Sequence, residues 1–240
     1  MDATSLWLVM RRKTLQVHRF KRWTWKLIAC PARCQPHKVV DMDDKGGRRG
    51  GRQRAKADFR FDDARLCFAF AATLADRGTD TPFERLTRPE DLGRWSVESG
   101  CTTVAPVCTE ADLDHARRLR EAVQRTGRAL ADEAPPARED IALINSAAAE
   151  PTSVPELSAD AASVHWHGDG ATGVLSMVAR DLIELCHSEH RTRVRICGNP
   201  ACGTPFVDTS RAGARRWCSM KTCGALAKKR TYRARSQNGP

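Results

Sequence analysis

The sequence lacks the long apolar run that a membrane-spanning protein needs. No stretch of its 240 residues approaches the roughly 18–20 consecutive apolar residues of a helix that crosses a bilayer. The opening stretch TSLWLVMRRK has too few apolar residues, with its charge on the wrong side of them, for a secretory signal. We therefore expect a cytoplasmic protein, a compartment in which cysteines stay reduced.

The sequence also lacks the signatures of common enzyme classes. It has no internal repeat, no P-loop and no dinucleotide-binding fingerprint. Its carboxylates lie mostly on the first turns and polar faces of expected helices, and no nucleophile–base pair supports an enzyme. We therefore expect no catalytic residues, and an enzyme is the least favoured class of function.

Positive charge is abundant, and it lies at the two ends of the chain. The net charge is +11. Residues 1–57 carry 15 Lys and Arg against 4 Asp and Glu, residues 58–189 carry 13 against 24, and residues 190–240 carry 12 against 1. Nucleic acid is the natural partner for such basic segments, and a solvated tail or the chain's own acidic middle are the alternatives.

Residues 1–57 have no helical or strand periodicity. The run DDKGGRRGGRQRAKAD, residues 43–58, has a composition typical of a flexible linker. We expect a basic, disordered leader, with two alternatives: an arm that touches nucleic acid, or a start assigned too far upstream of Met42. Cys30 and Cys34 have no second cysteine pair nearby and are interpreted as incidental.

Residues 58–190 have the periodicity of a folded domain. Thr109 can cap the most regular helix, whose apolar residues recur on one face. Thr87 and Glu90 have the spacing of a capping box at the start of another helix. Helices are expected over residues 87–100, 109–130, 138–150 and 173–190.

The strand signals in this domain are fewer. SVHWHGDG alternates Val164 and Trp166 against His165 and His167, which predicts a half-buried strand that ends in a turn, preceded by a loop through Pro155. The apolar run from Leu66 to Leu74 suits a buried helix or a strand. The prediction is a helix-rich α+β domain.

Neither the histidines nor the other cysteines of this domain have the pattern of a metal site. His165 with His167, and His187 with His190, lack a carboxylate or cysteine at ligand spacing, so we expect them to be surface residues. Four further cysteines are expected to be small buried apolar residues: Cys67, Cys101, Cys108 and Cys186.

Residues 191–235 contain two matched cysteine pairs. Four residues separate Cys197 from Cys202 and Cys218 from Cys223, and 15 residues separate the pairs. Two such pairs supply the four soft ligands of one tetrahedral structural zinc, with no open position for catalysis. A redox pair has shorter spacing and disulfides need an oxidising compartment, so zinc is favoured. GALAKKRTYRAR predicts a basic helix that begins close to Cys223.

The run CGNPACGTPFVDTSRAGARRWCSMKTCG resembles the CGNR zinc finger. That module typically follows an α/β domain called ABATE, in bacterial proteins described as stress-induced transcription regulators. FDDARLCFAFAATLADRG, LTRPEDLGRW, ARRLREAV and IALINSAAAE resemble ABATE in the same order. The resemblance covers roughly residues 58–235 and implies a zinc-binding regulator.

The sequence departs from the family at four motif positions. Ala225 and Leu226 replace the Asn and Arg for which the finger is named. In the front domain, Ala69 and Ala72 stand where the resemblance implies Asp and Asn. The cysteines are all present, so zinc binding is expected to survive these changes. Residues 1–57 have no counterpart in the family.

The finger is expected to hold its cations on one surface that binds nucleic acid phosphates. The expected function is therefore a zinc-dependent, DNA-binding transcription regulator. Its acidic domain would sense a small molecule or protein signal, or mediate association such as a homodimer. The alternatives are an RNA- or ribosome-associated or protein-binding adaptor that uses the same face, and docking of the basic helix on the acidic domain. The candidate contacts are Arg211, Arg215, Arg216, Lys228, Lys229, Arg230, Arg233 and Arg235, with residues 236–240 as a tail.

Overall fold

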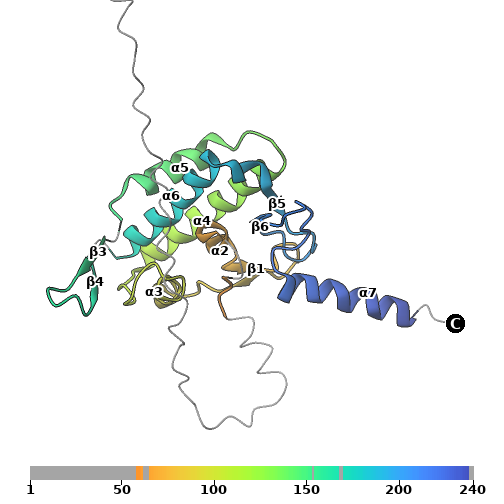
Figure 1. The fold of residues 1–240 in the computed structure, drawn as a ribbon, viewed down its shortest axis with the longest axis horizontal. Helices are drawn as coiled ribbons and strands as arrows, with labels where there is room; N and C mark the ends of the chain where they lie inside the picture. The colour runs from red at the N-terminus through yellow and green to blue at the C-terminus, as the bar shows by residue number, and fades with distance from the viewer. Residues whose placement is uncertain (1–57, 62–64, 153, 168–169, 238–240) are drawn as a thin grey trace, which may run out of the picture. The chain divides into compact units, whose positions relative to one another are not determined.

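A computed structural model describes residues 58–61, 65–152, 154–167 and 170–237 of the chain. The fold is α+β, as expected: helices dominate, and the strands form small antiparallel pairs (Figure 1). The leader expected over residues 1–57, with Cys30, Cys34 and Met42, lies outside the described residues. The helices are α2 (Leu66–Ala71), α3 (Pro89–Glu98), α4 (Glu110–Ala131), α5 (Arg138–Ala149), α6 (Ala171–His187) and α7 (Ala225–Gln237), with the short turns η2 (Glu189–Arg193) and η3 (Met220–Gly224).

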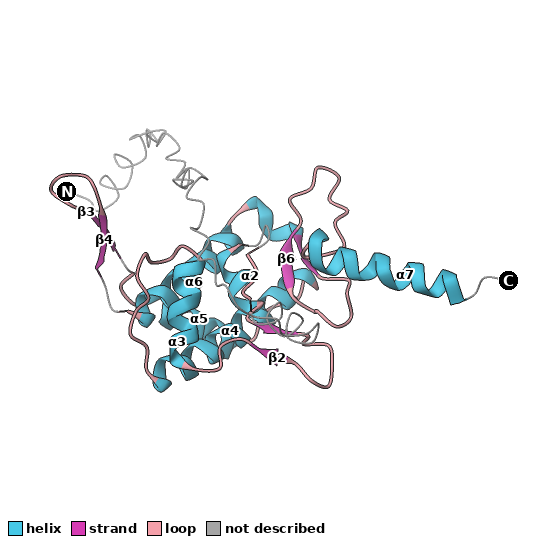
Figure 2. Ribbon diagram, turned by 90° about the horizontal axis from the view of Figure 1, so that it is seen from below, coloured by secondary structure: helices cyan, strands magenta, loops and turns pink. Residues whose placement is uncertain are grey.

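Among the described residues, the strands form three separate pairs, and Figure 2 shows β3 beside β4. Each pair joins two strands that follow one another in the sequence, so each closes locally. They are β1 (Leu74–Ala75) with β2 (Phe83–Glu84), β3 (Val154–Leu157) with β4 (Val164–His167), and β5 (Val194–Ile196) with β6 (Pro205–Val207).

The core lies among α2, α3, α4, α5 and α6. The apolar face predicted for α4 is buried along its length, and α4 packs against α2, α5 and α6. Phe70 of α2 meets Trp95 of α3 edge-on, with ring centroids 4.9 Å apart, and Trp95 is fully buried. Burial of these large side chains supplies most of the free energy that holds the helices together.

Helices α3 and α4 begin with capping boxes, as expected, but one residue of the α3 box differs from the prediction. Thr109 caps α4: its hydroxyl accepts from the backbone N–H of Asp112, whose carboxylate accepts from the N–H of Thr109. At α3 the prediction of Glu90 is wrong, because Asp91 accepts from the hydroxyl of Thr87 (2.6 Å) and from the N–H of Arg88. The carboxylate one residue further along reaches back to the helix start.

The apolar run from Leu66 to Leu74 suited either a helix or a strand, and it forms one after the other. It begins as helix α2 and ends in strand β1. The prediction of a half-buried strand at residues 164–167 is wrong in its burial: β4 forms, but Val164 is 44% exposed and all four residues of its partner β3 are exposed. Pro155, expected in a loop, lies in β3.

Many acidic side chains of the front domain pair with its own arginines. Arg120 is buried and donates to both carboxylate oxygens of Glu84, at 2.6 and 2.8 Å. Three more such pairs link separate segments: Arg65 with Asp181, Arg77 with Glu121 and Arg125 with Asp140. Part of the acidic charge seen in the sequence is therefore neutralised inside the domain.

Of the four other described cysteines, all expected to be buried, two are buried and two are only partly buried. Cys67 and Cys101 are buried, and burial raises the pKa of both thiols. Cys108 and Cys186 are partly buried, and burial raises the pKa of Cys108 to about 11. Within the part of the chain that the structure describes, no helix has the length and apolar character that a bilayer crossing needs.

Candidate metal centre and nucleic-acid interface

The first cysteine pair lies in the turn that joins β5 to β6. Cys197 follows β5, and its N–H donates to the carbonyl of Thr204 (3.0 Å), which continues the ladder by one step. The N–H of Cys202 donates to the carbonyl of Asn199 (2.8 Å), which closes the turn. Gly203 has a φ of +63°, a conformation that favours glycine. Both sulfurs are thereby directed to the same side of the hairpin.

The second pair lies where a loop enters the C-terminal helix. The hydroxyl of Ser219 accepts from the N–H of Thr222 (3.3 Å) and so caps the turn η3, which contains Cys223. Helix α7 follows directly, as predicted. The N–H of Cys218 donates to the sulfur of Cys197 (3.5 Å), which joins the second pair to the first.

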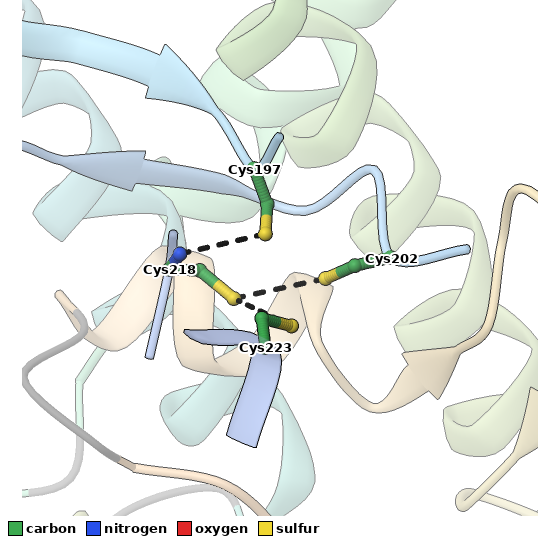
Figure 3. Close-up of side chains that lie close together, drawn as sticks. All are labelled: Cys197, Cys202, Cys218 and Cys223. Atoms are coloured by element: carbon green, nitrogen blue, oxygen red, sulfur yellow. Dashed lines mark hydrogen bonds between the residues drawn. The ribbon is translucent and has the colours of Figure 1, made fainter. Parts of the chain in front are cut away.

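The four sulfur atoms meet in one cluster (Figure 3). All lie within 4.8 Å of one another, and the distances from Cys218 to Cys202 and to Cys223 are 3.6 and 3.7 Å. A tetrahedral zinc with Zn–S bonds of about 2.3 Å requires sulfurs about 3.8 Å apart. Cys197, Cys202 and Cys223 are buried and Cys218 is partly buried. The donor set therefore fits the metal, and the cluster could hold one zinc ion.

The crowding of four thiols shifts their proton affinities in opposite directions. Hydrogen bonding with Cys197 lowers the pKa of Cys202 well below the usual range of a thiol and raises the pKa of Cys218 well above it. Four thiolates this close together would repel one another without a cation. A divalent cation removes that repulsion, so metal binding would release protons from the cluster.

Polar groups around the cluster orient its sulfurs. The side-chain amide of Asn199 donates to the sulfur of Cys223 (3.6 Å), and the hydroxyl of Thr204 lies 3.4 Å from the sulfur of Cys202. The carbonyl of the same Asn199 amide accepts from the guanidinium of Arg230 (3.1 Å). Asn199 thus links helix α7 to the cluster. The sequence placed Asn199 only in the turn, because nothing in the spacing predicts this second role.

The loop between the two pairs is held by Asp208. Its carboxylate accepts from the N–H and hydroxyl of Ser210, at 2.9 and 2.6 Å, and from the N–H of Arg215 (2.9 Å). These bonds, that of Ser210 first, lower the pKa of Asp208. The single acidic residue of the basic C-terminal segment therefore shapes the loop.

The finger is fixed to the front domain through its first cysteine turn. The N–H of Gly78 donates to the carbonyl of Ala201 (3.2 Å), and the amide of Gln124 on α4 donates to the carbonyl of Gly203 (2.8 Å). At Gly127, also on α4, a Cβ would lie 2.7 Å from side-chain atoms of Phe68 and Pro205. These contacts join segments far apart in the sequence and have no periodic signature, which is why the sequence did not reveal them.

The structure divides the predicted nucleic-acid contacts into four groups. Arg215 is partly buried, and its guanidinium donates to the carbonyls of Trp217 (2.9 Å) and Cys218 (2.6 Å), so it serves the finger itself. Arg230 is exposed but reaches Asn199. The side chain of Arg235 lies outside the described residues. The others are exposed: Arg211, Arg216, Lys228, Lys229 and Arg233.

Helix α7 leads away from the β5–β6 hairpin, as Figures 1 and 2 both show. It packs mainly against η3 at its own start. From Lys228 to Ala234 every side chain is exposed. The alternative in which this helix docks on the acidic front domain therefore does not describe the packing of its described residues.

The described histidines are not part of the cluster formed by Cys197, Cys202, Cys218 and Cys223. His165 and His187 are exposed and His190 is partly buried, while the side chain of His167 is not among those described. Within the described residues, the cysteine cluster is the group of three or more potential ligands close enough to hold a metal.

Two family models match the chain. The model of ABATE, described as "Putative stress-induced transcription regulator", matches residues 64–189, which is more than half of the chain. The chain belongs to the ABATE family. The model of the CGNR zinc finger matches residues 193–236, so the ABATE domain is followed by a finger that contains the four clustered cysteines. Both families are regulatory or metal-binding rather than enzymatic in description. No curated protein matches the chain.

Two of the four departures from the family motifs meet in space. Ala72 of the ABATE domain and Leu226 of the CGNR finger line the same cavity of about 60 Å³, which Cys202 and Cys223 also line. The resemblance implies polar side chains at both positions. In this chain both side chains are apolar, so the two substitutions lie at one cavity between the ABATE domain and the finger.

Proposed function

We propose that this ABATE protein is a zinc-dependent, DNA-binding transcription regulator of the bacterial cytoplasm, in which the CGNR finger contacts DNA. The observation that carries the proposal is the exposure of the cations on α7 while the start of that helix is fixed at the cysteine cluster. An exposed basic helix with no apolar stripe gains little from burial, whereas contact with phosphates would use its exposed cations.

The charge around the finger supports a phosphate partner. From Thr209 to Pro240 the sequence contains no Asp or Glu. Arg211 and Arg216 add exposed cations from the loop beside the helix. A helix fits the major groove of duplex DNA, where arginine can read guanine through two hydrogen bonds.

Zinc, held by Cys197, Cys202, Cys218 and Cys223, would supply structural crosslinking. Four protein sulfurs complete its coordination, so it would leave no position for a substrate. The cysteines bring the β5–β6 turn, the loop and the start of α7 to one point. The cations on either side of that point would then approach DNA as one surface.

The ABATE domain is proposed to receive the regulatory signal, a small molecule or a protein partner, in a response to stress. Contacts from Gly78 and Gln124 to the first cysteine turn give the domain a direct route to the finger. A change in the ABATE domain that moves α4 would also move this turn. The cytoplasm suits the proposal because reduced thiols are needed to hold zinc.

A salt-dependence experiment tests DNA binding. Affinity for a random 20-base-pair DNA duplex is measured by fluorescence anisotropy from 50 to 300 mM salt, alongside an RNA duplex of the same sequence. For DNA, replacing Lys228, Lys229 and Arg233 with alanine is expected to reduce the slope of log K against log salt by about 3, since each lost phosphate contact removes about 0.9. The control Arg118→Ala removes an exposed arginine from α4 and should leave the slope unchanged.

Four results would contradict parts of this proposal. Equal slopes for the parent and the triple variant would exclude α7 as the phosphate-binding element. Tighter binding of RNA than of DNA would favour the adaptor alternative. Well under one zinc per chain, or unchanged DNA binding in Cys197→Ser, would contradict the zinc-dependent scaffold.

A further inference from the structure

A groove on the finger is used neither by the cysteine cluster nor by the contacts with the ABATE domain. It has a volume of about 380 Å³ and lies between the turn η3 and the first half of α7. Trp217 and Met220 line it from the segment around the second cysteine pair, and Lys228, Thr231 and Tyr232 line it from the helix. Apolar and aromatic side chains thus meet at the surface of the most basic part of the protein.

These apolar side chains are unusually accessible. Tyr232 is 74% exposed and Met220 is 55% exposed. Tyr232 is the single tyrosine of the chain. Large exposed apolar side chains gathered in a groove mark a binding site more often than scattered ones do.

The groove depends on a glycine. A Cβ at Gly224 would lie 3.3 Å from Trp217 Cδ1 and 3.3 Å from Met220 Cε. The absence of a side chain there lets both residues approach the start of α7. The groove is therefore built by the same segment that carries Cys223.

The charge around the groove is positive. The guanidinium of Arg216 lies 5.2 Å from the centroid of the Trp217 ring, and Lys228 lines the groove itself. No acidic residue occurs after Asp208 in the sequence. A ligand for this surface combines negative charge with a flat apolar unit, and a nucleotide has both.

We propose that this groove binds one unpaired base of a nucleic acid, stacked on the exposed ring of Tyr232, while the surrounding cations hold the adjoining phosphates. The inference rests on the nucleic-acid binding proposed above and specifies the form of the nucleic acid. In an intact duplex only the edges of the bases are accessible in the grooves. An aromatic side chain can stack on a base only where that base has left the helix, as in a bulge, a melted segment or a single strand.

The proposal predicts a preference that can be measured as a ratio of affinities. Stacking of one base on an aromatic side chain contributes about 1–3 kcal/mol, which corresponds to a factor of about 5 to 150 in affinity. The full-length protein is therefore expected to bind a 20-base-pair DNA with one unpaired thymine about 5- to 150-fold more tightly than the fully paired duplex.

Variants of Tyr232 separate stacking from charge. Tyr232→Ala should reduce the preference for the bulged DNA to near unity and leave affinity for the paired duplex almost unchanged. Tyr232→Phe keeps the ring and should keep the preference. Lys229→Ala removes a neighbouring exposed cation and should weaken both DNAs by a similar factor, so the ratio survives. Zinc content is measured for each variant to confirm that the finger is intact.

The outcomes distinguish the two proposals. Equal affinity of the parent for both DNAs, or a preference that persists in Tyr232→Ala, would overturn the base-binding groove while duplex binding stands. A groove that serves an acidic peptide instead would give that same result. Absence of binding to either DNA would overturn both the groove and the DNA-binding function.

Discussion

A single methyl group added at Gly78 should displace the first cysteine turn of the finger from the ABATE domain. A Cβ on this residue would overlap the carbonyl oxygen of Pro200 and lie 2.9 Å from its carbonyl carbon. Both are backbone atoms of the first cysteine turn, so no side-chain rotation can relieve the overlap. The variant Gly78→Ala must therefore push the loop and the turn apart.

The expected cost has two parts. Overpacking against a rigid neighbour costs about 1–3 kcal/mol. Displacement also breaks the hydrogen bond from the N–H of Gly78 to the carbonyl of Ala201 (3.2 Å), a loss of about 1 kcal/mol. A total near 3 kcal/mol corresponds to a fall in Tm of roughly 6–12 °C for a protein of this size.

Thermal unfolding and zinc release together check this expectation. Gly78→Ala should lower the Tm and release zinc faster to a chromophoric chelator, because the first cysteine pair loses its support. Asp80→Ala, two residues along the same exposed loop, serves as the control and should behave like the parent. If Gly78→Ala matched the parent in both measurements, the inference that this loop holds the cysteine turn would be wrong.

Two further predictions concern a polar group beside the cluster and a buried ion pair. Asn199→Ala should weaken zinc affinity about 10- to 100-fold in a competition titration, because the Asn199 amide donates to the sulfur of Cys223. The control Asn145→Ala removes an exposed amide from α5 and should leave zinc affinity unchanged. Equal zinc affinities of Asn199→Ala and the parent would show that Asn199 does not support the metal site. Arg120→Ala should lower the free energy of unfolding in urea by about 3–5 kcal/mol because Glu84 loses its partner, and adding Glu84→Ala should restore part of the loss. Additive losses in the double variant would show that the two side chains are not coupled.

Periodicity was sufficient for the long helices. The apolar residues over 109–130 and over 173–190 recur with the spacing of a helix, so a helix places them together on one face. Both segments form helices with that face buried. The cysteine spacing was equally informative, because two short-spaced pairs have one economical way to bring four sulfurs together. These features depend on residues close in sequence.

The sequence was less informative where the burial of a residue, or its partner, depends on segments that are distant in the sequence. Alternation predicted strand β4 but not its exposure, since burial is decided by whether another element covers the hairpin. A count of charges could not tell Arg215, engaged with finger carbonyls, from the exposed Arg216 beside it. The contact of Gly78 with the cysteine turn is between backbones, which carry no pattern in the sequence.

The contacts of Gln124 and Gly127 with the finger limit how this protein can be recombined with others. Gln124 bonds to the backbone of Gly203, and Gly127 leaves room for Phe68 and Pro205 to meet. A finger exchanged between relatives would have to match this surface of α4 as well as keep its cysteines. The ABATE domain and its finger are therefore expected to be inherited and exchanged as a pair, so that a chimaera joined at residue 190 folds only if it carries a compatible α4.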